Sequence, residues 1–584
     1  MSFLLGSFGP IVQTCMQKII NCAKAQPGSV IVSFDQGILI ANTENTYDSE
    51  IITLDNKGLL LGKLFNKLEY GPAKLAIEDI HMLINHPTLF TKNFWGSYCG
   101  AFYNNQNKKC VIIRDPIGLS TIFYSISSKG IIFSTNMDLL CDILETRSSI
   151  DLNYFANYIV NRNQALSSTP FQKVKELLPG TQLTIQSDGN FKIEKIWDFS
   201  SSKGSSIKDE NEFKEELLSI LRSCIKAWVG DSPGVCLELS GGTDSSALMI
   251  LLRDIFDNKK LIGVNYIDSK TPSSNEIQYA QEVVDICKAP LYFLDWKDFS
   301  VLDPLPNHIR PNKPSTLHLY PKSAVALSDI AKQNGNLILM NGQGGDHVFI
   351  SPQPQEALAD YWIDHGFYNI SKPAQELIAA YRMPAWLLTK QTIKNIWNYY
   401  KRNGSIIYDT PFLTKEFMES FKPEEFYLKE DLINFYPGKA AHISSLAHAI
   451  SYAERNQVFS HAVIHPFLSQ PIVELGLKIP TYQSFGNGFD RILLRKAISK
   501  VKTSTAMWRK TKGETTSTII KEFSSRADKI SEIILDGKLV NSGMIDKQWL
   551  NDQLIRIRHG QAENLWPIMH ILTSQIWLNQ WQIK

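Results

Sequence analysis

The chain has 584 residues, of which 43% are hydrophobic and 20% are charged, and its formal net charge is +2. That length predicts more than one domain, and the composition is typical of folded globular proteins. A charge so close to zero argues against a surface that coats nucleic acid, so we expect no nucleic-acid partner.

The eight cysteines are scattered, and none has the Cys-x-x-Cys or Cys/His spacing of a structural zinc site. We therefore expect free thiols in a reducing compartment. No apolar run reaches the length of a membrane-spanning helix, and no signal-peptide pattern opens the chain. These features predict a cytoplasmic protein without an integral membrane segment, and peripheral membrane association stays open.

The first part of the chain, residues 1–199, is predicted as one domain that is rich in short strands. One helical pattern lies at Ile11–Ala25, and turns rich in Asn, Gly and Lys separate the apolar runs. Examples of the predicted strands are Ser29–Phe34, Gly37–Ile40, Cys99–Tyr103, Cys110–Ile113, Thr121–Ser125 and Gly130–Ser134.

Residues 200–206 are small, polar and glycine-containing, as in a linker to a second domain at 207–584. In that domain short apolar runs alternate with helical patterns, and the remainder from about residue 355 is predicted mostly as helix. The alternation predicts an α/β fold with a doubly wound parallel sheet, which binds ligands at the carboxyl ends of its strands. The predicted elements are strands Val235–Leu239, Leu261–Tyr266, Pro290–Leu294 and Asn336–Met340, and helices Glu210–Trp228, Ser246–Ile255, Asn275–Cys287 and Ser323–Gln333.

The most informative loop follows the first of these strands, where an apolar run breaks into two glycines and opens a helix. The N–H groups of a first helical turn and the helix dipole attract a phosphate, and glycines let the backbone approach it. Asp244 would repel a bare phosphate, which indicates a bridging Mg²⁺. A plain turn with a helix cap is the alternative. The glycines and hydroxyl donors of this loop are Ser240, Gly241, Gly242, Thr243 and Ser245.

A second loop of this kind follows the fourth predicted strand, where Gly342-Gln343-Gly344-Gly345 leads to Asp346. Alone it is a weak signal, since a plain turn is about as common. In a parallel sheet, however, this loop would lie near the first one. Asp244 and Asp346 could then share a Mg²⁺ that is bound to a triphosphate.

With these motifs the chain resembles the asparagine synthetase superfamily, whose SGGxDS loop binds the pyrophosphate of ATP. The resemblance covers nearly the whole chain in order. It implies an N-terminal glutaminase-like αββα sandwich of the N-terminal-nucleophile hydrolase type and a C-terminal ATP-pyrophosphatase-type domain with many helices. The synthetase marks are SGGTDSS at 240–246, GQGGD at 342–346, His465–Leu468, Leu493–Ala497 and Trp508–Gly513, and the glutaminase marks are Gly96–Phe102, Arg114–Gly118 and Leu178–Thr181.

Departures from the family pattern narrow the expected reaction. Glutamine-dependent members expose a cysteine at position 2, where this chain has Ser2, and the Arg-Gly-Pro-Asp type of glutamine-clamping loop is absent. A serine hydroxyl needs a strong base to act as a nucleophile. We therefore expect an inactive, structural first domain, with a serine hydrolase as the alternative. An amine on the substrate would then replace ammonia, as in β-lactam synthetases and lasso peptide cyclases.

The second loop favours the lasso cyclases. Asparagine synthetases have Glu and β-lactam synthetases Tyr at the place of Gln343, which cannot act as a general base. The ending Gly-Gly-Asp and the segment 509–513 are more similar to the lasso cyclases. The resemblance implies Lys512 as the cation that stabilises the developing negative charge. Lys512 and Gln343 are the predicted catalytic residues.

The expected enzyme uses ATP and Mg²⁺ to adenylate an Asp or Glu side chain of a precursor peptide. The N-terminal amine of the peptide then closes a macrolactam, and AMP and pyrophosphate leave. The resemblance implies a leader peptidase and a leader-recognition protein as further partners. Two alternatives stay open: a β-lactam-forming or asparagine-synthetase-like small-molecule amide synthetase, and a catalytically silent nucleotide-binding scaffold.

Other residues of the expected ATP site carry weaker predictions. Leu239 and Val264 either flank the adenine or belong to the core. Asn341 and Gly342 are expected to contact the nucleotide through their backbone, and Arg509, with Lys510, to lie beside the phosphates.

Three further features have a structural alternative that is at least as good. Glu276 is interpreted as part of a helix cap rather than as a ligand of Mg²⁺-pyrophosphate. His347 is either a base for the amine or a histidine that opens a helix. Arg114 and Asp115 are interpreted as a structural ion pair.

Overall fold

The computed structural model describes most of the chain between residues 2 and 582. The predicted linker at 200–206, Glu276 and Lys512 lie outside the described residues. The segments not described are 10–12, 27, 35, 44–48, 105–106, 129, 162–163, 187, 200–206, 208, 270–276, 308, 336, 351–352, 402–409, 454–462, 511–515 and 562.

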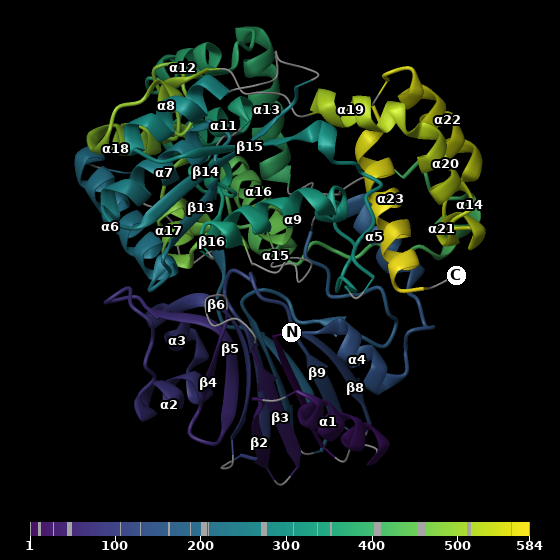
Figure 1. Ribbon diagram of the computed structural model, residues 1–584. Helices are drawn as coiled ribbons and strands as arrows, with labels where there is room; N and C mark the ends of the chain where they lie inside the picture. Colours follow the sequence, from purple (N-terminus) through teal and green to yellow (C-terminus); the bar gives the residue numbers. More distant parts are fainter. Residues whose placement is uncertain are drawn as a thin grey trace.

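The N-terminal third of the chain, which is the first of the two structural parts, contains two antiparallel six-stranded sheets that pack face to face (Figure 1). The first sheet has the order β10 (Lys175–Glu176), β8 (Phe123–Ser127), β9 (Gly130–Ser134), β1 (Phe3–Phe8), β3 (Gly37–Asn42) and β2 (Val30–Phe34). The second has the order β12 (Phe191–Lys195), β11 (Thr181–Gln186), β7 (Lys109–Arg114), β6 (Phe94–Asn104), β5 (Gly58–Asn66) and β4 (Glu50–Thr53).

Helices cover the outer face of each sheet. Helices α1 (Gln13–Ala25) and α4 (Met137–Leu144) pack on the first sheet, and α2 (Ile77–Asn85) and α3 (Pro87–Asn93) on the second. A separate apolar core fills the space between the sheets, because alternate side chains of each strand point inward. The expected αββα sandwich is confirmed. The structure adds β1, β4, β5, β10, β11 and β12 to the strands named from the sequence.

The second, larger part of the chain, from α6 (Glu210–Val229) onward, is built on a parallel five-stranded sheet. Its order is β15 (Leu291–Asp295), β14 (Lys260–Ile267), β13 (Gly234–Glu238), β16 (Ile338–Met340) and β17 (Val463–Ile464). The chain winds outward from β13 in one direction and then returns to wind in the other. The expected doubly wound sheet is therefore confirmed, with β17 as an additional strand that sequence analysis did not predict.

Alternate side chains of β13 face two different cores. Val235 and Leu237 pack against α6 (Glu210–Val229), α7 (Thr243–Ile255) and α8 (Ile277–Cys287), whereas Cys236 packs against α9 (Pro321–Gln333). Helices on both faces bury the parallel sheet, which explains why its strands are almost continuously apolar.

The rest of the chain is mostly helical, as expected, and no helix of its described part is long and apolar enough to cross a membrane. The helices are α5 (Leu152–Asn161) in the first half and α10 (Gly345–Val348), α11 (Pro354–His365), α12 (Ser371–Tyr381), α13 (Ala385–Lys401), α14 (Lys415–Ser420), α15 (Lys429–Leu432), α16 (Pro437–Ala453), α17 (Gln470–Leu477), α18 (Ile492–Val501), α19 (Thr516–Ser525), α20 (Ala527–Leu535), α21 (Lys538–Asn541), α22 (Lys547–Arg558) and α23 (Leu565–Gln580) in the second.

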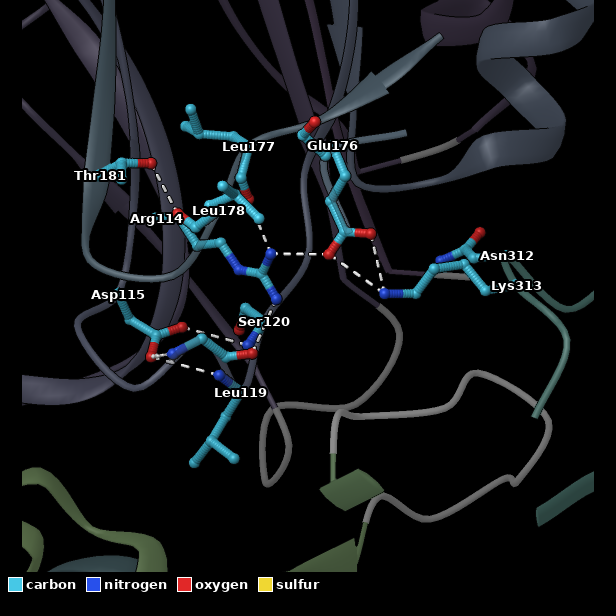
Figure 2. A network of polar contacts seen from close by, with 12 residues as sticks. Arg114, Asp115, Leu119, Ser120, Glu176, Leu177, Leu178, Thr181, Asn312 and Lys313 are labelled. Atoms are coloured by element: carbon cyan, nitrogen blue, oxygen red, sulfur yellow. Dashed lines mark hydrogen bonds and ion pairs between the residues drawn. The ribbon is translucent and has the colours of Figure 1, made fainter. Parts of the chain in front are cut away.

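A buried ion network joins the two halves. The carboxylate of Glu176 accepts a hydrogen bond of 2.7 Å from Arg114 of the sandwich and one of 2.8 Å from Lys313 of the second half (Figure 2). Only 1% of the Glu176 side chain is exposed, so its carboxylate is paired with these two cations in the interior. Lys67 makes a second ion pair across the interface, at 2.8 Å from Glu474.

The last helix, α23, returns to the N-terminal half and packs against α5. The indole nitrogens of Trp577 and Trp581 both donate to the carbonyl oxygen of Pro311, at 2.7 and 3.0 Å. The same two rings contact Phe171, and Trp577 also contacts Phe155. The last helix of the described chain thus covers part of the surface of the first half.

Candidate active site

The two glycine-containing loops lie next to each other at the carboxyl edge of the parallel sheet. Strands β13 and β16 pair directly, with Leu237 opposite Met340, and each runs straight into its loop. The winding of the sheet reverses between these two strands. Such a reversal opens the crevice in which doubly wound folds bind ligands.

The first loop turns sharply and leaves the start of α7 accessible. Gly241 has φ of 74°, a left-handed conformation that favours glycine, and Gly242 is the N-cap of α7. Because Gly242 has no side chain, it offers no capping oxygen of its own to the first turn. The hydroxyls of Ser240 and Ser245 lie 3.1 Å apart at the entrance to the helix. The loop thus combines helix N–H groups with two hydroxyls, as phosphate binding requires.

The second loop fits against the first so closely that a side chain at either of two of its glycines would require the neighbouring atoms to shift. A Cβ atom on Gly345 would lie 2.5 Å from Cγ of Asp244, and one on Gly342 would lie 2.8 Å from the backbone nitrogen of Ser245. Asp346 follows directly in α10. The glycines of the second loop therefore bring the two predicted acidic residues to one place.

Arg491 is the principal site residue that sequence analysis missed. Its Nη1 donates a 2.6 Å hydrogen bond to Oδ2 of Asp244. Burial alone would lower the pKa of Arg491, but three nearby carboxylates raise it above its usual value, those of Asp244, Asp490 and Asp346. Arg491 immediately precedes α18 and the family-like segment 493–497, which is the signal that could have found it.

The two carboxylates fit a Mg²⁺ ion that is held partly by phosphate. Asp244 and Asp346 both act on the same cation, Arg491, and Oδ1 of Asp346 also lies 2.7 Å from Nδ1 of His347. Among the described residues no group of three or more His, Cys, Asp and Glu side chains could hold a metal. A two-carboxylate site suits Mg²⁺, which usually keeps several waters and phosphate oxygens as ligands.

A second polar cluster lies beneath the loops and was not foreseen. Asn341 donates a 3.4 Å hydrogen bond to Glu238, and its Oδ1 accepts one of 3.1 Å from the backbone of Gln343. The same Oδ1 lies 2.7 Å from Nδ1 of His465. Burial raises the pKa of Glu238 to about 7. Asn341 thus holds the second loop by its side chain, whereas we expected only backbone contacts to the nucleotide from it.

Leu239 and Val264 are fully buried, and their side chains belong to cores on opposite faces of the sheet. This supports the core alternative over side chains that flank an adenine. Arg509 does reach the site, because its Nη1 donates a 3.0 Å hydrogen bond to the carbonyl oxygen of Gly241. Its guanidinium also stacks 4.8 Å above the ring of Tyr279.

The expected pair in the first half, Arg114 and Asp115, interacts electrostatically, and each residue has further partners. Arg114 pairs with Glu176, and Asp115 accepts hydrogen bonds from the backbone nitrogens of Gly118 and Ser120, at 2.6 and 3.1 Å (Figure 2). The Asp115 carboxylate therefore fixes the turn that follows β7. The Ser2 hydroxyl lies 3.1 Å from that of Thr43.

Comparisons with known proteins agree with this arrangement. The asparagine synthase family model matches residues 216–581, and the glutamine amidotransferase domain model matches residues 80–197. Among curated proteins, the chain is 20% identical over 442 residues to "Asparagine synthetase [glutamine-hydrolyzing] 1" of Bacillus subtilis, covering 69% of this chain and 65% of that protein. It is 24% identical over 319 residues to "Putative asparagine synthetase [glutamine-hydrolyzing] 2" of Methanocaldococcus jannaschii, covering 53% of this chain and 54% of that protein.

The chain thus spans less than two thirds of the length of these curated relatives. Similar solved structures include the glutamine phosphoribosylpyrophosphate amidotransferase of B. subtilis, with 11% identity and a TM-score of 0.23 over 52% of this chain and 83% of that one. The ammonia-dependent NAD synthetase of Campylobacter jejuni has 15% identity and a TM-score of 0.18 over 35% of this chain and all of that one. The family model extends over more than half of the chain, and this protein therefore belongs to the asparagine synthase family.

Proposed function

We propose that this protein is an ATP-dependent, AMP-forming amide ligase. The observation that carries the proposal is the interlocking of the two loops, which brings Asp244, Asp346 and Arg491 to the N-terminus of α7. A triphosphate needs N–H donors, cations and carboxylates that hold Mg²⁺, and this edge of the sheet supplies all three.

In the proposed reaction the chain binds and orients ATP. The first turn of α7 and the Ser240 and Ser245 hydroxyls donate to phosphate oxygens, and Arg491 turns from Asp244 toward the phosphates as ATP enters. Arg509 holds the loop through the carbonyl of Gly241. When bound between Asp244 and Asp346, Mg²⁺ would neutralise phosphate charge. Lys512 stays the proposed cation for the charge that develops on the acyl group.

The carboxylate of the substrate attacks the α-phosphorus of ATP, and the bond from that phosphorus to the bridging oxygen breaks. Pyrophosphate leaves, and an acyl-adenylate forms. An amine then attacks the acyl carbon, the bond to AMP breaks, and the amine loses a proton to a base or to solvent. Holding the amine beside the activated carbonyl supplies the effective concentration for this step.

We propose further that both reacting groups belong to one peptide, so that the product is the macrolactam of a lasso peptide. Ser2 in place of a cysteine and Gln343 in the second loop support this assignment. A precursor peptide, a leader peptidase and a leader-recognition protein are the corresponding partners.

The test is pyrophosphate release by the purified chain with ATP and Mg²⁺. We expect release in the presence of the precursor peptide freed of its leader, together with a product lighter than the peptide by one water. Asp244→Asn should abolish both. Release with the peptide but no loss of water would contradict cyclisation, and no release with any carboxylate would contradict the ligase itself.

The curated relatives favour a second candidate, an enzyme that makes an amide from a small carboxylic acid. Aspartate with ammonia and an N-carboxyalkyl amino acid are the substrates that test it. Pyrophosphate release with either, and none with the peptide, would replace the lasso assignment and leave the ligase chemistry intact.

A further inference from the structure

One face of α13 exposes a row of large apolar side chains. The exposed fractions are 67% for Trp386, 50% for Ile393, 61% for Trp397 and 69% for Tyr400. Large aromatic residues on a protein surface usually mark an interaction site when they lie together. These four lie on a single helix.

Helical geometry puts the four side chains into one stripe. At about 100° per residue, Trp386, Ile393, Trp397 and Tyr400 fall within an arc of about 60°. The buried residues Leu388 and Thr392 lie about 150° and about 110° from the centre of this stripe and anchor the helix. Thr392 Oγ1 donates a hydrogen bond to the carbonyl oxygen of Gln355 in α11. The stripe therefore points away from the protein.

All charged residues of the helix are also basic. It contains no Asp or Glu, and its three cations, Lys390, Lys394 and Lys401, are exposed along one flank of the apolar stripe. Within the described part of the chain none of the three forms an ion pair, and Lys401 lies 4.4 Å over the ring of Trp397. An apolar stripe edged by lysines is complementary to a surface that is apolar inside and negatively charged at its boundary.

We propose that this face of α13 binds the surface of an anionic lipid membrane. The two tryptophans, Tyr400 and Ile393 would enter the boundary between headgroups and acyl chains, and the lysines would contact the lipid phosphates. Figure 1 places α12 and α13 at the end of the molecule opposite the N-terminal sandwich. A membrane can therefore approach α13 without meeting the first half of the chain.

The composition of the face favours a membrane over a protein partner. Protein interfaces are enriched in Arg and depleted in Lys, whereas all cations of α13 are lysines. The face is also a helix that projects outward, which suits a flat, deformable layer. Because α13 packs on α11, which begins shortly after Asp346, binding would hold the candidate active site close to the bilayer. The proposal does not depend on the ligase activity.

The test is flotation of the purified full-length chain with vesicles of phosphatidylcholine, with or without phosphatidylglycerol. We expect partitioning onto the anionic vesicles that weakens as salt is raised, and little onto the neutral ones. The triple variant Lys390→Gln, Lys394→Gln, Lys401→Gln should lower the partition coefficient by roughly 100-fold, and Trp386→Ser with Trp397→Ser by at least about tenfold.

Matched variants test whether vesicle binding requires this face of α13 or only exposed charge and aromatic surface in general. Lys192→Gln, Lys415→Gln, Lys502→Gln removes the same charge elsewhere, Trp566→Ser with Phe191→Ser removes exposed aromatics elsewhere, and the triple Lys→Arg variant of α13 keeps the charge. All three should partition like the wild type. Thermal unfolding checks that each variant is folded.

Failure of the wild type to float with anionic vesicles would overturn the proposal, as would unchanged partitioning of the two α13 variants. A concentration-dependent dimer in sedimentation velocity that Trp386→Ser with Trp397→Ser abolishes would assign the face to a second copy of the chain instead.

Discussion

Arg491 and Asp244 form a 2.6 Å ion pair at the start of α7, although 247 positions separate them in the chain. The pair neutralises a carboxylate that would otherwise repel phosphate from the helix N-terminus. It also positions the Arg491 guanidinium close to the site that the phosphates would occupy.

Arg491→Ala should lower ATP-dependent pyrophosphate release by roughly 100-fold, because one charged donor to the phosphates is lost. Arg491→Lys should recover part of the rate, since it keeps the charge but not the fork of donors. Steady-state pyrophosphate assays measure both. Arg222→Ala, which breaks the exposed pair with Asp254, is the matched control. An Arg491→Ala enzyme with the wild-type rate would remove Arg491 from the site.

Gly345→Ala should disturb the same site, because the added methyl group alters the contact between the two loops. Its Cβ would approach Cγ of Asp244 to 2.5 Å, so Asp244 or the second loop must move. We expect weaker ATP binding in calorimetry and a loss of about 1–3 kcal/mol of stability. Gly71→Ala adds a methyl group where no atom lies within 4 Å and should change neither. Equal ATP affinity in both variants would show that the two loops need not be interlocked.

Glu176→Gln should destabilise the folded chain by about 3–5 kcal/mol, because it leaves the buried Arg114 guanidinium without its carboxylate. Urea unfolding measures the change. Glu194→Gln, which breaks the exposed pair with Lys192, should cost at most about 1 kcal/mol. Similar costs for the two substitutions would mean that the ion network contributes no more than a surface ion pair.

Glu238 should make stability depend on pH. Burial raises its pKa from 4.5 to about 7, so between these values the folded state keeps a proton that the unfolded state releases. Its contribution favours folding at low pH and is lost as pH rises toward 7. Glu238→Gln should therefore be more stable than the wild type at pH 8, with the difference shrinking toward pH 5. Melting temperatures across this range measure it, and a difference that grows toward pH 5 would contradict the raised pKa.

Glutamine should not be a nitrogen source. With Ser2 as the second residue, we expect no glutamate from glutamine, and Ser2→Ala should leave pyrophosphate release unchanged. A glutaminase assay on both proteins decides the matter. Glutamate formation that Ser2→Ala abolishes would establish a serine nucleophile instead.

Sequence patterns predicted the strands and loops whose signals come from residues close together in the chain. The strands β13 to β16 and the loops that follow β13 and β16 are local signals, because apolar runs, glycines and helix starts lie within a few positions of each other. Strand β17, only two residues long, gives no such signal. The pairing of two loops about 100 residues apart was predictable because parallel strands end at one edge of a sheet.

Contacts made across the fold were not predictable in this way. Arg491 and His465 reach the site from segments far along the chain. Both lie in or beside family-like segments, but no local pattern shows that they contact Asp244 and Asn341. Arg114 illustrates a partner that sequence cannot reveal. Its sequence neighbour Asp115 does interact with it electrostatically, but the fold also hydrogen-bonds Asp115 to the backbone and brings Glu176 to Arg114.

Because α23 covers aromatic residues of the N-terminal half, part of that half cannot be buried until the end of synthesis. Phe155 and Phe171 are made early, but the tryptophans that cover them, Trp577 and Trp581, are made more than 400 residues later. Until then a growing chain displays uncovered aromatic surface, which favours aggregation or capture by chaperones. The first half can form its sandwich early, but its surface is completed only when the last helix has been translated.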